Sequence, residues 1–277
     1  MKLTIITGGS KGIGQCLIRH LLGQGSVLNI SRTPAPVDAP EGSPHKLFNL
    51  CVELSDLPAL EATLDAWLNE HPEYVVSLFI SNAAALELSW LTELSLDRMQ
   101  KSFAVNTLAP VAISSLLFRL GKFSQDGARI IYVTSSLARN VEALSFAGIG
   151  LYSATKAALG RLASIQRREC ALQTPWVSVT QVHPGIVDTA MQHNLRCDKG
   201  IDPAFATKTA GLPPYQEGDW DTVAPADKLR TIPADFAADF IFWISRIAST
   251  DLSHEYDFYS CASFHDETRQ WRMHPTG

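Results

Sequence analysis

The sequence predicts an α/β fold, in which one domain is built on a doubly wound parallel sheet with helices on both faces. Three observations predict it. Short apolar runs, which suit strands buried on both sides, alternate over residues 3–182 with longer segments of helical periodicity. A glycine-rich turn lies between the first apolar run and the first helical segment. The 277 residues suit one large domain with a substantial core, and no internal repeat or low-complexity segment marks a second domain.

The first strand, turn and helix lie in residues 3–21. The apolar run Leu3–Ile6 is followed by Thr7–Gly14, which reads Thr-Gly-Gly-Ser-Lys-Gly-Ile-Gly, and Ile13, Leu17 and Leu21 then recur at helical spacing. Such a turn lets backbone N–H groups approach a pyrophosphate, whose charge the helix N-terminus favours. Its spacing, G-x-x-x-G-x-G, departs from the commoner G-x-G-x-x-G, so a chance glycine turn before a helix is the alternative.

The next elements repeat this alternation. Gly23 and Gly25 end the first helix, and a proline-rich loop at 33–44 separates the second strand from the third. By their apolar runs, strands are expected at about 26–30, 47–54, 75–80, 129–134 and 177–182. By their helical spacing, helices are expected at about 57–68, 96–103, 110–120 and 152–170.

The C-terminal third has a different texture. From 193 to 232, Gly, Pro, Asp and Lys break every period, which predicts a long loop or helical flap over the site. An amphipathic helix is expected at 233–248, a last strand at 255–259, and an ordered or frayed tail at about 260–277.

Charge and cysteine content narrow the function classes. The net charge of −5, with Lys and Arg scattered singly, offers no basic stripe for nucleic acid or an anionic membrane, so a small-molecule partner is expected. The five cysteines are widely spaced, without a C-x-x-C pair, which predicts reduced thiols and no metal site. No apolar signal core and no stretch of about 20 apolar residues is apparent, which predicts a cytoplasmic protein outside the membrane.

The sequence Tyr152-Ser-Ala-Thr-Lys156 places a phenol and an ammonium on one helical face. A tyrosine in water has a pKa near about 10, too high for efficient proton transfer at neutral pH. A neighbouring lysine lowers the pKa of the phenol toward the working range of a general acid–base catalyst. Taken alone, the same spacing also fits an ordinary surface pair.

Further motifs accompany this pair in a fixed order. They are Ser81-Asn82-Ala83-Ala84 after the fourth strand, Asn106 within Ala-Val-Asn-Thr, Ser135-Ser136 after the fifth strand, and Pro184-Gly185-Ile186-Val187 after the sixth. With the glycine turn, the chain resembles the classical short-chain dehydrogenase/reductases from residue 3 to about 190. Within that family it is most similar to the branch of sepiapterin and benzil reductases, on the segments Ser31-Arg32, Pro184–Gln192 and Asp257-Phe258-Tyr259.

The resemblance implies a Rossmann fold and a catalytic set of four residues. Tyr152 would protonate the carbonyl oxygen as hydride arrives, and Ser136 would hydrogen-bond the same oxygen. Lys156 would hold the nicotinamide ribose and lower the pKa of the tyrosine, while Asn106 would support a water that links the lysine to solvent. Its neighbour Ser135 is the alternative catalytic serine. The gap from Ser136 to Tyr152 is longer than is usual in the family, and the extra residues are expected at 139–150, where they would shape the pocket.

Cofactor choice is argued from charge. The position after the second strand reads Ser31-Arg32, without the carboxylate typical of NAD enzymes, and Arg32 and Lys11 could both bind a 2′-phosphate. NADPH is therefore expected over NADH, unless Arg32 is a solvated loop charge. Ala84 and Glu53 stand where the family has Gly and Asp, which leaves the adenosine contacts open. The expected cofactor residues are Gly8, Ser10, Lys11, Gly12, Ile13, Gly14, Ser31, Arg32, Asn82, Ala83, Tyr152, Lys156, Pro184, Gly185, Val187 and Thr189.

The expected activity is NADPH-dependent reduction of a ketone in a pterin, an aromatic diketone or a molecule of similar shape. Asp257 would anchor a pterin or simply end a strand, and Leu137 and Met191 would line the substrate pocket. Trp90, Leu144, Phe146 and Trp220 lie in segments that border that pocket in the family. The alternatives are reduction of a 3-oxoacyl thioester and a non-catalytic NADPH-binding regulator. The family analogy also predicts a homodimer that pairs the helices at 110–120 and 152–170.

Overall fold

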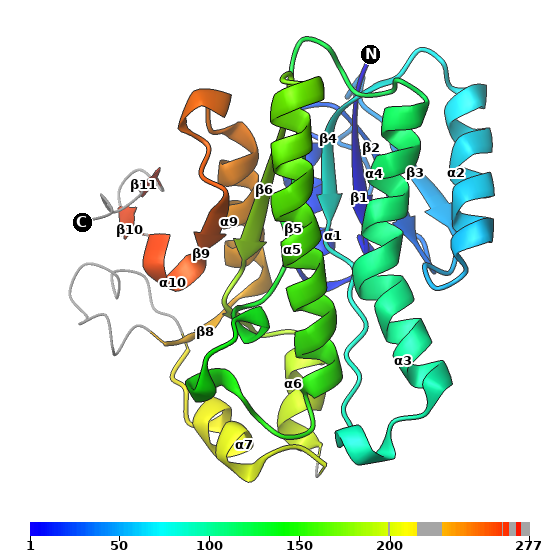
Figure 1. The fold of residues 1–277 in the computed structure, drawn as a ribbon. Coiled ribbons are helices and arrows are strands. Elements are labelled where there is room, and N and C mark those ends of the chain that lie inside the picture. Colours follow the sequence, from blue (N-terminus) through cyan, green and yellow to red (C-terminus); the bar gives the residue numbers. More distant parts are fainter. Residues whose placement is uncertain (199, 215–228, 262, 266–269, 273–277) are drawn as a thin grey trace.

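A seven-stranded parallel sheet forms the centre of the protein, as seen in a computed structural model (Figure 1). The structure describes residues 1–198, 200–214, 229–261, 263–265 and 270–272. The strand order is β3-β2-β1-β4-β5-β6-β9, and every neighbouring pair is parallel. The strands are β1 (Lys2–Thr7), β2 (Ser26–Ser31), β3 (Leu47–Cys51), β4 (Val75–Ser81), β5 (Ala128–Val133), β6 (Val177–His183) and β9 (Glu255–Asp257). The predicted doubly wound sheet is thereby confirmed.

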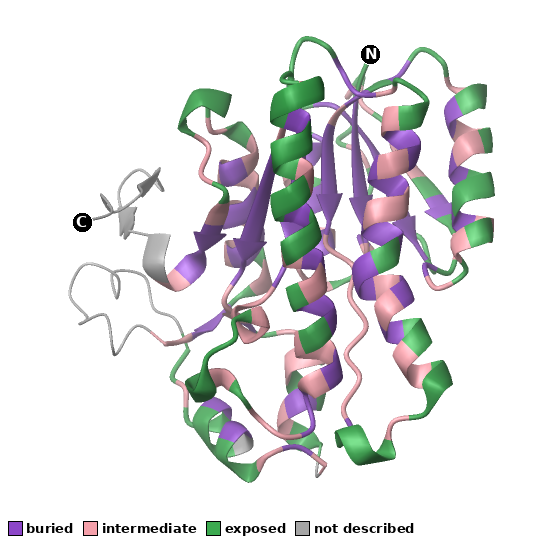
Figure 2. Ribbon diagram, in the orientation of Figure 1, coloured by how far each residue is buried: buried purple, intermediate pink, exposed green. Residues whose placement is uncertain are grey.

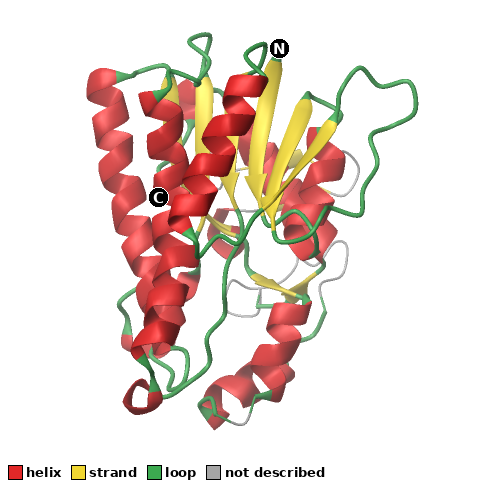
Figure 3. Cartoon of the chain, turned by 90° about the vertical axis from the view of Figure 1, so that its right-hand side faces the viewer, coloured by secondary structure: helices red, strands yellow, loops and turns green. Residues whose placement is uncertain are grey.

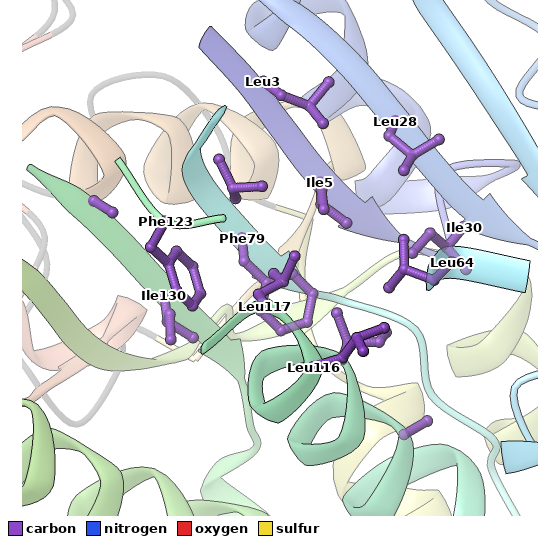
Figure 4. Close-up of a cluster of buried hydrophobic side chains, with 14 of the residues drawn as sticks. Leu3, Ile5, Leu28, Ile30, Leu64, Phe79, Leu116, Leu117, Phe123 and Ile130 are labelled. Carbon is purple, nitrogen blue, oxygen red and sulfur yellow. The ribbon is translucent and has the colours of Figure 1, made fainter. Parts of the chain in front are cut away.

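Helices cover both faces of the sheet, as Figure 3 shows from the side. One face carries α1 (Gly12–Leu21) and α9 (Ala234–Arg246), and the other carries α2 (Leu57–Glu70), α4 (Ala109–Arg119) and α5 (Gly150–Gln173). Successive side chains of a strand point to opposite faces, so Ile5 joins the core under α2, α4 and α5 while Ile6 joins the core under α1 and α9. Figure 4 shows the first of these cores, and Figure 2 shows the strands buried between the helical layers.

The expected helices at 96–103 and 110–120 are one continuous helix. α3 (Leu96–Phe103) passes through a π-helical turn (Ala104–Leu108) into α4. By length and composition alone, Leu96–Arg119 is the one helix of the described residues that could cross a membrane, although Asp97, Arg98 and Lys101 interrupt its apolar residues. Its most apolar window is 56% buried within the protein, because Ile113, Leu116 and Leu117 pack on the sheet.

The flap region at 193–232 is partly helical. The short strand β7 (Ile186–Val187) is followed by the helices α6 (Ala190–Cys197) and α7 (Pro203–Ala210). Further along the chain, β8 (Thr231–Ile232) pairs with β7 in parallel. The last strand of the sheet ends at Asp257 rather than at Tyr259, because the Asp257 carboxylate accepts the N–H of Tyr259 and begins the short helix α10 (Phe258–Cys261). In the tail, β10 (Ser263–His265) pairs with β11 (Gln270–Arg272).

Short 3₁₀ turns complete the chain at Leu91–Glu93, Ser136–Ala138, Glu142–Leu144 and Ser249–Asp251. The strand order reverses between the neighbours β1 and β4. After β1 the chain continues to β2 on one side, and after β4 it continues to β5 on the other side. At such a switch point, the loops after the two strands diverge and leave a crevice at the carboxyl edge of the sheet.

Candidate active site

A large cleft of about 1780 Å³ opens at this carboxyl edge. It is larger than the roughly 300–1,000 Å³ of a usual small-ligand pocket, which gives room for two molecules side by side. Every predicted site residue lines it except Gly14 and Asn106, which lie behind its wall. The segments at 8–13, 82–88, 133–139, 184–195 and 205–212 all contribute to the lining.

The glycine turn shapes one end of the cleft. Gly8 and Gly12 adopt φ values of +73° and +57°, which L side chains rarely adopt, and a Cβ on Gly14 would lie 2.3 Å from the Gly8 carbonyl oxygen. No side chain caps the N-terminus of α1, and no acidic residue lies in its first turn. The N–H groups there and the positive end of the helix dipole therefore fit an anionic pyrophosphate.

Side chains on β1, β2 and β4 hold the turn in place. The Thr7 hydroxyl accepts the backbone N–H groups of Asn82 (3.1 Å) and Ala83 (3.0 Å), and the Asn82 amide donates to the Thr7 carbonyl (3.1 Å). Sequence reasoning missed Asn29, whose buried Oδ1 accepts the N–H of Gly9 at 2.9 Å. Its only sequence signal was a polar residue within an apolar strand.

The two charges at the end of β2 and β3 lie together. Arg32 Nη1 is 3.9 Å from Glu53 Oε2, and the Arg32 side chain is 72% exposed. Both residues line the cleft, as do Lys11 and Ser31. An exposed pair at this distance contributes little to stability, so the guanidinium can reorient toward a ligand.

Tyr152 and Lys156 lie in the first turns of α5, on the wall of the cleft. The buried Lys156 donates from Nζ to the carbonyl oxygen of Val133 (2.7 Å), at the end of β5. Burial lowers the pKa of Lys156 to about 8. Burial also raises the pKa of Tyr152 to about 12, and a hydrogen bond from Ser135 acts in the opposite direction. The expected lowering of the tyrosine pKa is therefore wrong for this structure, because desolvation outweighs the neighbouring donor.

Ser135, the alternative to the predicted Ser136, is the serine whose hydroxyl lies near enough to Tyr152 to act on its pKa. Ser135 follows β5 in an extended conformation, and its Oγ also accepts the N–H of Leu137 at 3.3 Å. Ser136 begins the 3₁₀ turn and also lines the cleft. The two adjacent serines are hard to tell apart by sequence, because the sequence does not reveal where the strand ends and the turn begins.

Asn106 joins two walls of the cleft from behind. It lies fully buried in the π-helical turn, where its Oδ1 accepts the N–H of Ala85 (2.7 Å). Its Nδ2 donates to the Ala85 carbonyl (2.8 Å) and to Thr155 Oγ1 (3.0 Å). Because Thr155 precedes Lys156 on α5, Asn106 fixes the catalytic helix against the loop after β4.

A charged cluster lies beyond Tyr152, at the edge of β9. Asp257 Oδ2 is 3.0 Å from Arg139 Nη1, and Arg139 Nη2 donates to Glu255 Oε1 at 2.8 Å. His183 Nε2 lies 3.0 Å from the same Glu255 oxygen. Burial lowers the pKa of His183, which favours its neutral form despite the carboxylate. The Asp257 carboxylate is thus already engaged by a cation, which the sequence did not reveal.

The remaining wall is apolar. Leu137 and Met191 line the cleft as predicted, together with Leu144 and Phe146, whereas Trp90 is 50% exposed and lies outside the lining. The ring of Phe146 meets that of Phe205 edge to face, with centroids 4.7 Å apart. Trp220 lies outside the described residues. Among the residues that the structure describes, no three His, Cys, Asp or Glu side chains gather as a metal site would require.

Comparison with known proteins agrees with this geometry. The family model described as short chain dehydrogenase matches residues 2–200. The benzil reductase ((S)-benzoin forming) of Bacillus subtilis is 28% identical over 206 residues, which cover 73% of this chain and 81% of that protein. The L-xylulose reductase of Mesocricetus auratus is 30% identical over 188 residues, which cover 68% and 72%.

A similar fold is found among solved structures. A short chain dehydrogenase from Burkholderia cenocepacia J2315, in complex with NADP, superposes with a TM-score of 0.67 at 21% identity, over 92% of this chain and 94% of that one. With a family model that spans more than half of its length, this chain belongs to the short-chain dehydrogenase family of nicotinamide-dependent oxidoreductases.

Proposed function

We propose that the protein is an NADPH-dependent carbonyl reductase that acts on a bulky, largely apolar ketone such as an aromatic 1,2-diketone. The observation that carries the proposal is the grouping of Ser135, Tyr152 and Lys156 in one cleft, next to a glycine turn that fits a pyrophosphate. The benzil and L-xylulose reductases among the relatives are named for carbonyl reductions, which supports the same reaction class.

Protonated Tyr152 is the proton donor in this proposal. Burial raises the pKa of Tyr152 to about 12, so the hydroxyl holds its proton at neutral pH and gives it up only to the more basic oxygen that develops as hydride reaches the carbonyl carbon. The Ser135 hydroxyl donates a second hydrogen bond to that oxygen and stabilises the charge that develops there. When bound, the nicotinamide cofactor supplies a hydride to the carbonyl carbon. The C=O bond becomes C–O–H, and the proton taken from Tyr152 is replaced from solvent.

Lys156 holds the cofactor side of the cleft. Its Nζ uses one donor on the Val133 carbonyl, and an ammonium carries three. The other two donors can bind ribose hydroxyls, as the family resemblance implies. Asn106 acts through α5, by fixing the backbone between Tyr152 and Lys156.

Arg32 and Lys11 favour NADPH over NADH, because both are cations on the cleft wall and the loop after β2 carries no acid. Glu53 moderates this preference, since it lies 3.9 Å from Arg32. The NADP bound to the Burkholderia cenocepacia relative supports the same choice.

The state of Asp257 favours an apolar ketone over a pterin. A carboxylate that recognises pterin N–H groups must accept hydrogen bonds from them, but Asp257 is already paired with Arg139. The wall opposite is formed by Leu137, Phe146 and other apolar side chains, which suits an aromatic ring.

A homodimer and a cytoplasmic location complete the proposal. Leu162 and Ile165 lie exposed on α5, which would pair across a two-fold axis. Light scattering at working concentration should give twice the chain mass.

The test of the function is oxidation of NADPH by the purified protein with benzil, sepiapterin or an acetoacetyl thioester. We expect turnover with benzil, and a lower kcat/KM with the other two. Tyr152→Phe should lose at least about 100-fold in kcat while NADPH binding, followed by fluorescence, stays unchanged. Unchanged kcat in this variant would remove Tyr152 from the mechanism, and a protein that binds NADPH but reduces none of the three would favour the regulator.

A further inference from the structure

The two ends of the segment between β7 and β8 meet at a short base, and the segment also packs on the rest of the protein through Leu195, Ile201 and Phe205, which share a buried cluster with Ile149. β7 and β8 form only two residue pairs, Ile186 with Thr231 and Val187 with Ile232. The segment that they enclose, residues 188–230, contains α6 and α7 and supplies Met191, among others, to the cleft wall. A two-stranded pairing this short has little stability of its own in water.

The hydroxyl of Tyr259 binds both sides of this base. It accepts the backbone N–H of Ile186 at 2.9 Å and donates to the carbonyl oxygen of Arg230 at 2.6 Å. Burial raises the pKa of Tyr259 well above its usual value, so the proton that it donates stays in place at physiological pH. One oxygen therefore ties the entry and the exit of the 188–230 segment together.

The Tyr259 ring also fits a gap that the local sequence leaves open. Gly185 adopts a φ of +86°, and a Cβ there would lie 3.3 Å from the Tyr259 Cζ and hydroxyl atoms and 2.4 Å from Ile232 Cδ1. The glycine before β7 thus permits the close approach of the ring.

The Asp257 carboxylate holds Tyr259 in place and reaches the opposite wall of the cleft. Its Oδ1 accepts the N–H of Tyr259 at 2.9 Å, and its Oδ2 lies 3.0 Å from Arg139. Arg139 belongs to the segment after β5, which also carries Ser135 and Leu137. The corner between β9 and α10 is therefore the point at which both walls of the substrate side are attached.

We infer that Tyr259 is a positioning residue, whose hydroxyl holds the two ends of the 188–230 segment so that α6 and α7 stay against the substrate side of the cleft. It does not touch the reacting atoms. The expected effect of Tyr259 on the KM for benzil rests on the proposed function, whereas its expected effect on amide exchange at the base of the segment does not.

The test compares Tyr259→Phe with Tyr256→Phe. Tyr256 is a matched control, because its hydroxyl also accepts a backbone N–H, that of Ser253 at 2.9 Å. Tyr256 lies on β9, where it pairs with Val182 of β6 and not with β7 or β8. Amide hydrogen exchange is measured on peptides that cover 186–188 and 230–232, with the β5 peptide 128–133 as an internal reference for global unfolding. We expect at least about tenfold faster exchange at 186–188 and 230–232 in Tyr259→Phe, and no change there in Tyr256→Phe.

Kinetics with NADPH and benzil form the second arm. Tyr259→Phe should raise the KM for benzil at least about fivefold with kcat within about twofold of the wild type, because the pocket wall loosens while Tyr152 stays in place. Unchanged exchange at both base peptides would overturn the inference, and so would equal acceleration in the two variants. If the wild type does not reduce benzil, the proposed function fails, but the exchange experiment still decides the role of Tyr259.

Discussion

The nucleotide end and the substrate end of the cleft are built in different ways. At the nucleotide end, backbone conformation and short-range contacts dominate: Gly8 and Gly12 take left-handed conformations, and Thr7 and Asn82 join two adjacent strands. At the substrate end, Arg139 and Tyr259 make contacts to residues far away in the sequence. The first end therefore has a recognisable motif, whereas the second depends on side-chain partners that no local pattern announces.

The largest effect is expected where backbone space is the constraint. Gly14→Ala places a methyl 2.3 Å from the Gly8 carbonyl oxygen, so the turn must shift and the cradle for the pyrophosphate is lost. We expect the affinity for NADPH to fall by at least about 100-fold, measured by fluorescence titration.

Gly121→Ala is the control for a Gly→Ala change away from the turn, because Gly121 has a positive φ of +62° and nothing lies within 4 Å of the added methyl. It should lower thermal stability by about 1 kcal/mol and leave NADPH affinity unchanged. Equal losses of affinity in the two variants would mean that a general loss of stability, and not the shape of the turn, lowers the affinity for NADPH.

The second prediction concerns Lys156, which lies between the two ends of the cleft and whose replacement should affect stability and activity in opposite directions. Lys156 is buried and its pKa falls from 10.5 to about 8, which corresponds to a cost of at most about 3 kcal/mol for holding the charge. Lys156→Met should therefore raise the free energy of unfolding at pH 7 by about 1–3 kcal/mol while kcat falls by about 100-fold.

The sign of the pH effect follows from the same pKa. Between pH 8 and 10.5 the unfolded chain holds more protons than the folded protein, so this group's contribution to stability rises with pH across that window. Thermal unfolding at pH 7 and pH 10 should show the advantage of Lys156→Met shrinking toward pH 10. If the stability advantage of Lys156→Met grew with pH, Lys156 would not be a buried lysine that is charged at pH 7.

The smallest effect concerns the exposed pair at the adenosine end. Arg32→Ala should raise the KM for NADPH about tenfold, because one charge-assisted hydrogen bond to the 2′-phosphate is lost. NADH, which lacks that phosphate, serves as the control, and its KM should change less than about twofold. Similar increases in the KM for NADPH and for NADH would show that Arg32 stabilises the loop and does not bind the 2′-phosphate.

The sequence predicts the nucleotide end well and the substrate end poorly, for a physical reason. Gly8, Asn82, Tyr152 and Lys156 lie at fixed offsets from strand ends and helix starts, so the motif carries the geometry with it. Asp257 could anchor a pterin or simply end a strand; it ends β9, and its partner Arg139 lies 118 positions earlier, in a segment longer than is usual in the family. Burial of Tyr152, which reverses the expected direction of its pKa, arises from packing over the whole cleft.

The two adjacent serines provide the most direct test of the whole account. Ser135→Ala and Ser136→Ala remove the same atom from neighbouring positions on the cleft wall, so kcat with NADPH and benzil can be compared directly. Because the Ser135 hydroxyl is the one that acts on the pKa of Tyr152, we expect Ser135→Ala to lose about 100-fold or more in kcat and Ser136→Ala to lose less than about threefold. The reverse order would place the carbonyl oxygen at Ser136 and contradict the catalytic geometry described for this structure.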